Sequence, residues 1–202
     1  IINCQFSFGQ IYEVGGVFGG TNFIGDVGDT QFINPNESGF GGIIKWNRSP
    51  RHSYRLSFIS TTITANDAES NDPRRKERGY HFSSNLKEIS TGMEFNFFDY
   101  NLHEYDVFFT PYIYSGIIYS KYENLFFNGD NLQNSGEYDW SFGIPMVLGV
   151  KYRIFDQFIL SFEIGARYTF SDKIDGSLPY NDNFNYTFGN ENNNDWYMFS
   201  GF

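Results

Sequence analysis

The stretch Phe158–Phe170, which reads FILSFEIGARYTF, decides the fold of this chain. Its even-numbered positions are apolar from end to end, whereas its odd-numbered positions include hydroxyls, a glycine and the opposite charges of Glu163 and Arg167. A period of two is typical of a β-strand whose two faces meet different surroundings. The alternation is longer than a usual strand of about five or six residues and suffices for a tilted membrane crossing of about nine to eleven. We therefore interpret the stretch as a lipid-facing strand of an outer-membrane β-barrel.

The composition favours the same class. The chain has 202 residues, enough for one domain, and aromatic residues make up 21% of it, with 24 Phe and 15 Tyr. Aromatic residues form the two girdles of a membrane barrel. The mean hydropathy of −0.43 is low, and no window has the roughly eighteen consecutive apolar residues of a spanning helix. A barrel that alternates apolar and polar residues is expected to have such values.

Charge and cysteine content exclude several functions. The net charge is −10 and the pI about 4.6, whereas a nucleic-acid-binding protein normally carries a basic surface. We therefore expect no nucleic-acid partner. Cys4 is the single cysteine, so neither an internal disulfide nor a cysteine zinc site can form.

Seven further segments complete the predicted barrel. They are Ile11–Gly20, Gly39–Trp46, His52–Ala65, Lys87–Phe98, Val107–Lys121, Trp140–Phe155 and the start of an eighth strand at Asp195–Phe202. The connections between the strands alternate between long and short. The long ones are Thr21–Ser38, Asn66–Ser84, Tyr122–Asp139 and Ser171–Asn194, and the short ones are Asn47–Arg51, Asp99–Asp106 and Asp156–Gln157. This predicts an all-β fold, an eight-stranded antiparallel up-and-down transmembrane barrel with long outer loops, short periplasmic turns and both termini in the periplasm.

The first nine residues differ from the rest. IINCQFSFG ends in Ser7-Phe8-Gly9, a small-x-small pattern typical of signal-peptide cleavage. We expect residues 1–9 to be the remnant of a signal peptide and residues 10–202 to form the barrel. The alternative is lipidation of Cys4, for which the preceding Asn3 is poorly suited.

Charged side chains fall repeatedly on the predicted inner face. They comprise four carboxylates and five cations, namely Glu13, Lys45, Arg55, Glu88, Glu94, Lys151, Arg153, Glu163 and Arg167. Nearly balanced charges are what a water-poor lumen requires, because an unpaired buried charge is costly. We interpret the set as a structural salt-bridge network, and a proton or ion pathway remains the alternative.

No catalytic or metal site is predicted. On the strand map, His52 and His103 lie in or beside short turns and His81 in an outer loop, so none is placed to activate a serine at the membrane surface. Asp26, Asp29 and the acids of Asp172–Asp195 could ligate calcium, but they lack a regular spacing and fit turns better. The basic run Arg74–Arg78 could meet lipopolysaccharide phosphates or belong to a solvated loop. Neither an enzyme activity nor a cofactor is expected.

Several stretches together resemble a known family. They are EVGGVFGGTNFIGDVG (Glu13–Gly28), INPN (Ile33–Asn36), KWN (Lys45–Asn47), RGYHF (Arg78–Phe82), EFNFF (Glu94–Phe98), TPY (Thr110–Tyr112) and NDWYMF (Asn194–Phe199). In this order and spacing, the set is similar to the Bacteroidota outer-membrane barrel family that includes PorG, over nearly everything after Gln10. Members of that family continue the last strand beyond the NDWYMF segment, so the resemblance also implies that the eighth strand is truncated at Phe202.

The resemblance implies a non-enzymatic structural or anchoring component of the type IX secretion system, which serves protein secretion and gliding motility. Its partners would be outer-membrane lipid and the periplasmic lipoprotein ring of that system. If so, partner contacts are expected at the periplasmic side, on Asn47, Arg48, Arg51, Asn101, His103 and Asp156. Two alternatives remain open: a general anchoring or adhesion barrel like OmpA or OmpX, and a soluble lipocalin-like barrel with its faces reversed.

Overall fold

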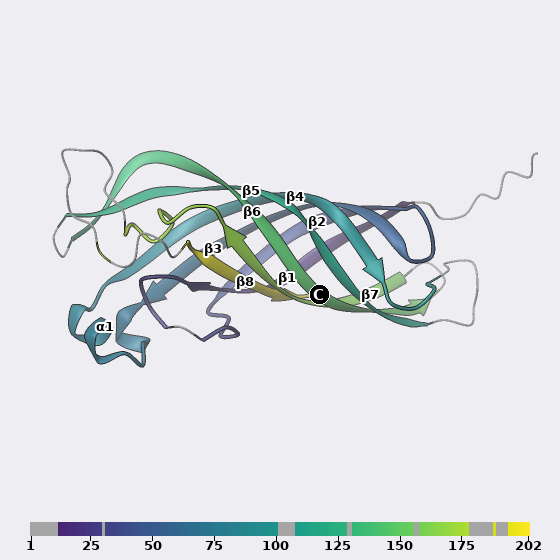
Figure 1. The fold of residues 1–202 in the computed structure, drawn as a ribbon, viewed down its shortest axis with the longest axis horizontal. Helices are drawn as coiled ribbons and strands as arrows, with labels where there is room; N and C mark the ends of the chain where they lie inside the picture. Colours follow the sequence, from purple (N-terminus) through teal and green to yellow (C-terminus); the bar gives the residue numbers. More distant parts are fainter. Residues whose placement is uncertain are drawn as a thin grey trace, which may run out of the picture.

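The computed structural model is a closed barrel of eight strands (Figure 1). It describes residues 12–29, 31–100, 108–128, 131–155, 158–177, 188 and 194–202. The strands are β1 Tyr12–Ile24, β2 Glu37–Asn47, β3 His52–Asn66, β4 His81–Asn96, β5 Phe109–Asn128, β6 Asn131–Phe155, β7 Phe158–Thr169 and β8 Trp196–Gly201. The predicted all-β class, strand number and up-and-down topology are therefore confirmed.

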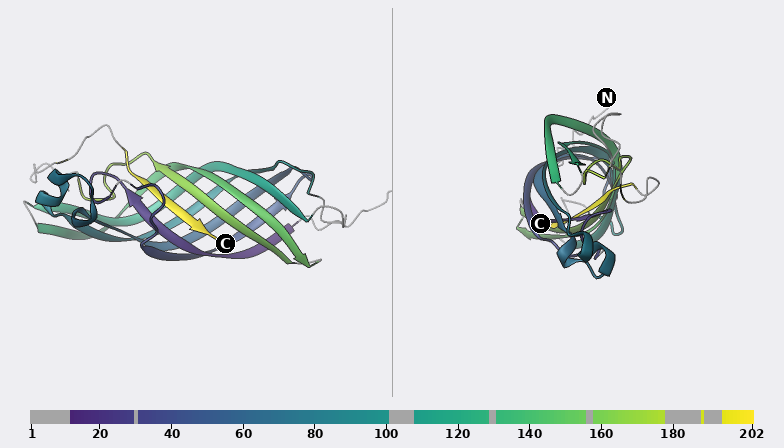
Figure 2. Two further views of the ribbon diagram at one scale, coloured as in Figure 1. Left: turned by 90° about the horizontal axis from the view of Figure 1, so that it is seen from below. Right: turned by 90° about the vertical axis from the view of Figure 1, so that its left-hand side faces the viewer.

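Each strand pairs with its sequence neighbours in antiparallel orientation. The ring closes where β1 pairs with β8, between Gly19↔Gly201 and Ile24↔Trp196. Figure 2 shows the strands crossing obliquely around a long axis. We call the end with the β2–β3 and β4–β5 connections the short-turn end, and the opposite end, with α1 (Pro73–Arg78), the loop end.

The two faces of the wall are chemically opposite. On β6, Phe142, Ile144 and Met146 are exposed on the outside, whereas Ser141, Val147 and Lys151 are buried inside, and the other strands alternate in the same way. An exposed apolar belt around a polar interior suits lipid outside the barrel. The faces-reversed soluble barrel is therefore not the arrangement of this chain.

The β5–β6 connection was predicted wrongly. The stretch Tyr122–Asp139 was expected to be a long loop, but β5 continues to Asn128 and β6 begins at Asn131. The ladder between them runs on to Asn128↔Asn131 with one irregularity between Glu123 and Leu125. Asparagine and glycine disfavour strands in general, but here the pairing across a hairpin overrides that preference.

The β3–β4 connection is also shorter than expected, because β4 begins at His81 and not at Lys87. It holds a 3-10 helix, Asp67–Glu69, and the helix α1. Asp72 caps α1 by accepting from the Arg74 amide, Pro73 occupies its first turn, and Gly79 ends it at φ 71°. The basic run Arg74–Arg78 is thus helical and not a loop. Among the described residues, neither helix is long and apolar enough to span a membrane.

Aromatic pairs lie near both ends of the wall. Trp46 contacts Tyr54 near the short-turn end, with ring centroids 5.5 Å apart. Towards the loop end, Trp140 stacks on Tyr119 at 4.8 Å and the Trp196 ring lies 4.7 Å from that of Tyr168. These positions match the two interfacial girdles of a membrane barrel.

The main apolar core lies at the loop end, inside the barrel. It is formed by Phe23, Val27, Ile63, Ala65, Tyr80, Phe82, Leu86, Tyr122, Leu125, Phe127, Ile174 and Tyr197. Tyr80 stacks on Phe127 with ring centroids 4.4 Å apart. Among the described residues, this core packs the loop end of the barrel.

Candidate functional site

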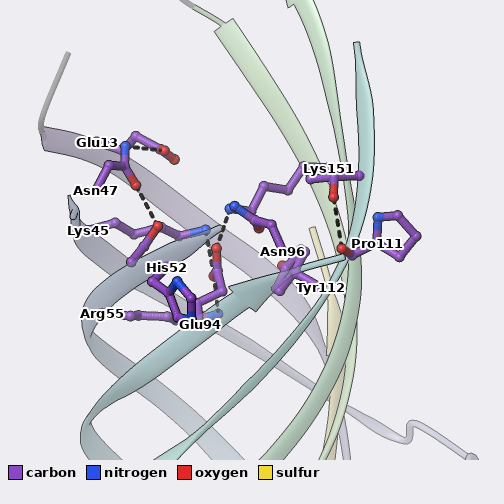
Figure 3. A network of polar contacts seen from close by, with 12 residues as sticks. Glu13, Lys45, Asn47, His52, Arg55, Glu94, Asn96, Pro111, Tyr112 and Lys151 are labelled. Atoms are coloured by element: carbon purple, nitrogen blue, oxygen red, sulfur yellow. Dashed lines mark hydrogen bonds and ion pairs between the residues drawn. The ribbon is translucent and has the colours of Figure 1, made fainter. Parts of the chain in front are cut away.

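Glu94 is the centre of the ionic network in the lumen (Figure 3). Its carboxylate is fully buried and forms ion pairs with Lys45, at 2.9 Å, and with Lys151. Arg55 lies further away, at 3.8 Å from the same carboxylate. β2, β3 and β6 thus each direct a cation at one acid from β4. Three cations around one buried carboxylate would leave excess charge, so a second acid is needed nearby.

Glu163 on β7 is that second acid. Arg55 holds it with two contacts, Nη1 to Oε1 at 2.5 Å and Nη2 to Oε2 at 3.0 Å. The Tyr112 hydroxyl donates to Oε1 at 2.5 Å. A two-point guanidinium–carboxylate contact is the strongest form of protein ion pair and fixes the geometry of both partners.

The Tyr112 ring also fills the lumen beside both lysines, since Lys45 lies 5.3 Å and Lys151 4.9 Å from its centroid. Gly149 leaves the space for this ring, because a Cβ there would collide with it. Arg55 lies 4.5 Å from the Tyr114 centroid. Aromatic faces therefore complete the environment of the cations.

A second group lies nearer the loop end. Arg167 Nε is 3.4 Å from a carboxylate oxygen of Glu88, and the Tyr197 hydroxyl donates to the same carboxylate at 2.6 Å. Arg167 also donates to the carbonyl of Gly165 at 2.8 Å. All three of these polar side chains are buried. Glu88 comes from β4, whereas Arg167 and Tyr197 come from β7 and β8, which pair with each other, so the group meets across the lumen.

The two remaining predicted lumen residues lie towards the short-turn end. Glu13 is half-buried and accepts from Asn47 Nδ2 at 2.7 Å, and Asn47 in turn accepts from Ser53 at 2.6 Å. Arg153 is buried beside Tyr100, with its guanidinium 5.3 Å from the ring centroid. The structure thus brings seven of the nine predicted residues into the two ion-pair groups. Glu13 and Arg153 lie outside these groups, nearer the short-turn end.

Taken together, these side chains fill the barrel with compensated charge. Arg55, Arg167, Tyr112, Tyr197 and Lys151 are among its largest fully buried side chains. An eight-stranded barrel is just wide enough for its interior side chains to fill, and among the described residues these side chains occupy the middle of the lumen. These ion pairs join strands from different parts of the barrel wall. Such an interior is poorly suited to passing a solute.

The short-turn end forms one continuous rim from two connections. Arg51, in the β2–β3 turn, pairs through its side chain with Asp99 in the β4–β5 connection, and the arginine lowers the pKa of that carboxyl. The backbone joins them too, since Asn96 donates to the Arg51 carbonyl at 2.8 Å and Tyr100 to the Pro50 carbonyl at 3.1 Å. Arg48 and Arg51 are exposed. The two turns are therefore joined into one surface that exposes Arg48 and the Arg51–Asp99 ion pair.

Of the other residues expected at this end, Asn47 is half-buried, donates from its side-chain amide to Glu13 and accepts from Ser53. Asn101, His103 and Asp156 lie outside the described residues, as does the predicted signal-peptide remnant 1–9.

One serine and one histidine do approach each other at this rim. Ser49 Oγ lies 3.2 Å from His52 Nδ1. The same oxygen accepts from the backbone amides of Arg51, at 3.3 Å, and His52, at 3.1 Å. This is the geometry of a side chain capping its own turn, and the pair stabilises the β2–β3 turn.

Asp26 and three acids of Asp172–Asp195, which the sequence suggested as turn residues or calcium ligands, form an acidic cluster at the loop end. Asp26, Asp172, Asp175 and Asp195 are all buried. Asp175 accepts from the amides of Asp26 and Ser177, both at 3.0 Å, and Asp195 accepts from the Ile174 amide at 2.9 Å. Burial raises the pKa of Asp175 to about 6 and, together with the charge of Asp175, raises that of Asp195 well above its ordinary value.

These carboxylates tie loop backbones to one another. In the part of the chain that the structure describes, no group of three or more His, Cys, Asp or Glu side chains is arranged to hold a metal ion. The members of the cluster come from two connections, β1–β2 and β7–β8, so their spacing in the sequence does not reveal that they meet.

Arg78 and Asp67 form a further loop-end contact outside the predicted set. Arg78 Nε lies 2.7 Å from Asp67, which is fully buried and also accepts from the amides of Gly28, at 2.8 Å, and Tyr80, at 3.0 Å. The contact fastens α1 onto the apolar core.

One family model, described as "Domain of unknown function (DUF6089)", matches residues 1–202. No curated protein matches the sequence. Among solved structures, the chain is similar to the attachment invasion locus protein Ail of Yersinia pestis, with 10% identity, 94% of each chain covered and a TM-score of 0.43. It is also similar to the N-terminal β-barrel domain of Pseudomonas aeruginosa OprF, with 14% identity, 96% of this chain and 99% of the other covered, and a TM-score of 0.44.

Proposed function

Because the chain belongs to this family of unknown function, we propose its role from the geometry: a non-enzymatic barrel of the outer membrane that anchors a periplasmic assembly. The closed, charge-filled lumen is the observation that carries this proposal. A barrel whose interior is packed with Arg55, Glu94, Glu163 and Tyr112 can act only through its two ends and its lipid-facing wall.

The outer membrane is the membrane that fits. The exposed belt of apolar side chains is flanked by aromatic pairs, and every crossing is a strand. Spanning β-barrels of this kind belong to outer membranes, where short turns face the periplasm and longer connections face outward. In this orientation the rim of Arg48, Arg51 and Asp99 lies in the periplasm, and α1 lies outside.

We assign the assembly to the type IX secretion system on the family resemblance of the segments from Glu13 to Phe199. The rim is the surface that would meet its periplasmic lipoprotein ring. The rim suits this task, because paired backbones hold its exposed arginines in place before a partner binds. In this orientation β1 begins at the periplasmic end of the wall, and β8 runs towards that end.

The test uses two matched double variants. Arg48→Ala with Arg51→Ala removes two exposed positive charges from the rim, and Arg74→Ala with Lys76→Ala removes two from α1 at the opposite end. Each double variant also removes one arginine that forms a surface ion pair, because Arg51 pairs with Asp99 and Arg74 with Asp72.

Each variant is extracted from outer membranes, and the periplasmic lipoproteins that co-purify are measured. We expect the amount of lipoprotein that co-purifies with the rim variant to fall at least tenfold relative to the unmodified protein. The amount that co-purifies with the α1 variant should not change. Equal retention in both variants would overturn the rim as the contact surface. Loss only in the α1 variant would favour the alternative, an OmpA- or OmpX-like barrel acting through its outer end.

A further inference from the structure

Two lysines on the outer face of the wall lie side by side. Lys87 on β4 is directly opposite Lys121 on β5 in the strand ladder. Lys87 is exposed and Lys121 half-buried, and each stands between two buried residues of its strand, so both point away from the lumen. The other lysines and arginines of the strands are all buried inside the barrel, namely Lys45, Arg55, Lys151, Arg153 and Arg167.

This pairing is unfavourable for the protein alone. Residues directly opposite each other in an antiparallel ladder have Cβ atoms about 4.5–5.5 Å apart, and like charges in such positions repel each other. Among the described residues, neither lysine forms an ion pair with a carboxylate. Glu123, two residues further along β5, accepts instead from the side-chain amides of Asn85, at 2.9 Å, and Asn134, at 3.3 Å. The two positive charges therefore have no carboxylate partner in the described part of the chain.

The lysines lie where the apolar belt meets the aromatic residues towards the loop end. On their short-turn side, the next outward-facing pair of the same ladder is Ile89 and Tyr119, both exposed. Trp140 on β6 is the ladder partner of Lys121 and stacks on Tyr119. The Lys121 ammonium lies 4.1 Å from the ring centroid of Tyr138 and 5.0 Å from that of Trp140. Aromatic faces thus hold this cation at the level of the interfacial girdle.

We propose that Lys87 and Lys121 bind the phosphate groups of a lipid headgroup in the outer leaflet, as in lipopolysaccharide. Phosphate oxygens accept charge-assisted hydrogen bonds from ammonium groups, and their negative charge offsets the repulsion between the lysines. The acyl chains of the same lipid would lie against the exposed side chains of Ile89 and Ile117. A lipid fits this surface better than a protein does, because the lysines border the belt that faces lipid.

Lipid binding to the purified full-length barrel in detergent micelles tests the proposal. Native mass spectrometry measures the Kd of lipid A that carries its phosphates and of the same lipid A after the phosphates are removed. Lys87→Gln with Lys121→Gln removes both charges from the wall, and Lys87→Arg with Lys121→Arg retains them. Arg74→Gln with Lys76→Gln is the matched control, because it removes two exposed charges from α1 at the same end.

We expect phosphorylated lipid A to bind the glutamine variant of the wall about tenfold more weakly than the unmodified protein. The arginine variant and the α1 control should keep the affinity of the unmodified protein. An unchanged Kd in the glutamine variant of the wall would overturn the proposal, as would an equal loss of affinity in the α1 control. Equal binding of lipid A with and without phosphates to the unmodified protein would also overturn it. Complete displacement of the lipid by millimolar inorganic phosphate would overturn the lipid in favour of a free anion.

The inference rests on the loop end facing outward, as in the proposed function, and does not involve the periplasmic rim. The purified barrel contains no periplasmic lipoprotein, so the lipid measurement is independent of that partner. Lipoprotein should still co-purify with the glutamine variant of the wall, and lipid A should still bind the rim variant. Failure of lipid binding and failure of lipoprotein co-purification are therefore separate outcomes.

Discussion

Arg55 and Glu163 lie on β3 and β7, on different parts of the barrel wall, and meet inside the lumen through two hydrogen bonds of 2.5 and 3.0 Å. They are 108 residues apart in the sequence. Both side chains are buried away from water, where an unpaired charge is costly. Each charge therefore needs the other as its partner. This pair joins strands that share no ladder and therefore holds the ring in one shape.

Removing one partner of this pair should destabilise the barrel strongly. Arg55→Met leaves Glu163 buried without its guanidinium, and breaking a buried pair in this way costs about 3–5 kcal/mol of the free energy of unfolding. The double variant Arg55→Met with Glu163→Leu should recover part of that loss. Urea titration of the folded band on unboiled gels measures both. A single variant as stable as the unmodified protein would contradict a structural role for the pair.

The filled lumen should not conduct ions. Because Arg55, Arg167, Tyr112 and Lys151 occupy the interior, we expect the purified full-length barrel to show no stepwise conductance in planar lipid bilayers. A porin reconstituted in the same bilayers serves as the positive control. Regular open-channel steps from the barrel would contradict the closed lumen and revive the ion-pathway interpretation of its charges.

The attachment of α1 should depend on Asp67. Asp67→Ala leaves the Gly28 and Tyr80 amides and Arg78 without their acceptor, at a cost on the order of 1–3 kcal/mol. We expect trypsin to cut the basic residues of α1 much faster in this variant. Asp72→Ala removes the cap of α1, worth about 1 kcal/mol, together with the surface ion pair to Arg74, and provides the comparison. Equal cleavage rates in the two variants would count against the anchoring contact.

The loop end should loosen as pH rises. Burial raises the pKa of Asp175 to about 6 from 3.8, and the neighbouring charge of Asp26 adds to the rise. Because the pKa of Asp175 is higher in the folded state than in the unfolded state, protonated Asp175 contributes to the free energy of unfolding. This contribution is full below about pH 3.8 and is lost as pH rises through about 6. The pKa of Asp195 is raised too, by burial and by the charge of Asp175.

Hydrogen exchange at the amides of Ile174 and Ser177, corrected for intrinsic rates, measures this change. We expect faster opening at pH 7.5 than at pH 5, and Asp175→Asn should remove most of the difference. An exchange rate that does not change between these two pH values in the unmodified protein would refute the expectation.

Much of the fold could be predicted because the alternation of faces is a local property. In Phe158–Phe170 and in β6, alternate residues were predicted to face outward and inward. The alternation of exposed and buried side chains in the structure agrees with this prediction. Strand ends were harder to place. Asn128 and Asn131 are in strands because the hairpin partner satisfies their backbone, which local composition does not reveal.

α1 could have been found from its sequence signals. The helix begins with a capping residue, Asp72, followed by a proline, Pro73, in its first turn. It ends at Gly79, a glycine in the left-handed conformation. The meeting of Asp26 with Asp175 and Asp195 could not be found in this way, because it requires the β1–β2 and β7–β8 connections to fold together. The identity of each ion pair in the lumen likewise depends on the stagger of the strands around the ring, which no single strand encodes.

The central claim is that an apolar wall faces lipid around a lumen filled with paired charge. An unboiled gel of detergent-extracted outer membranes containing the full-length protein tests it most directly. We predict that the protein is found in that fraction and runs as a compact band that shifts to a slower mobility on boiling. Recovery in the soluble fraction with no shift on boiling would contradict the claim.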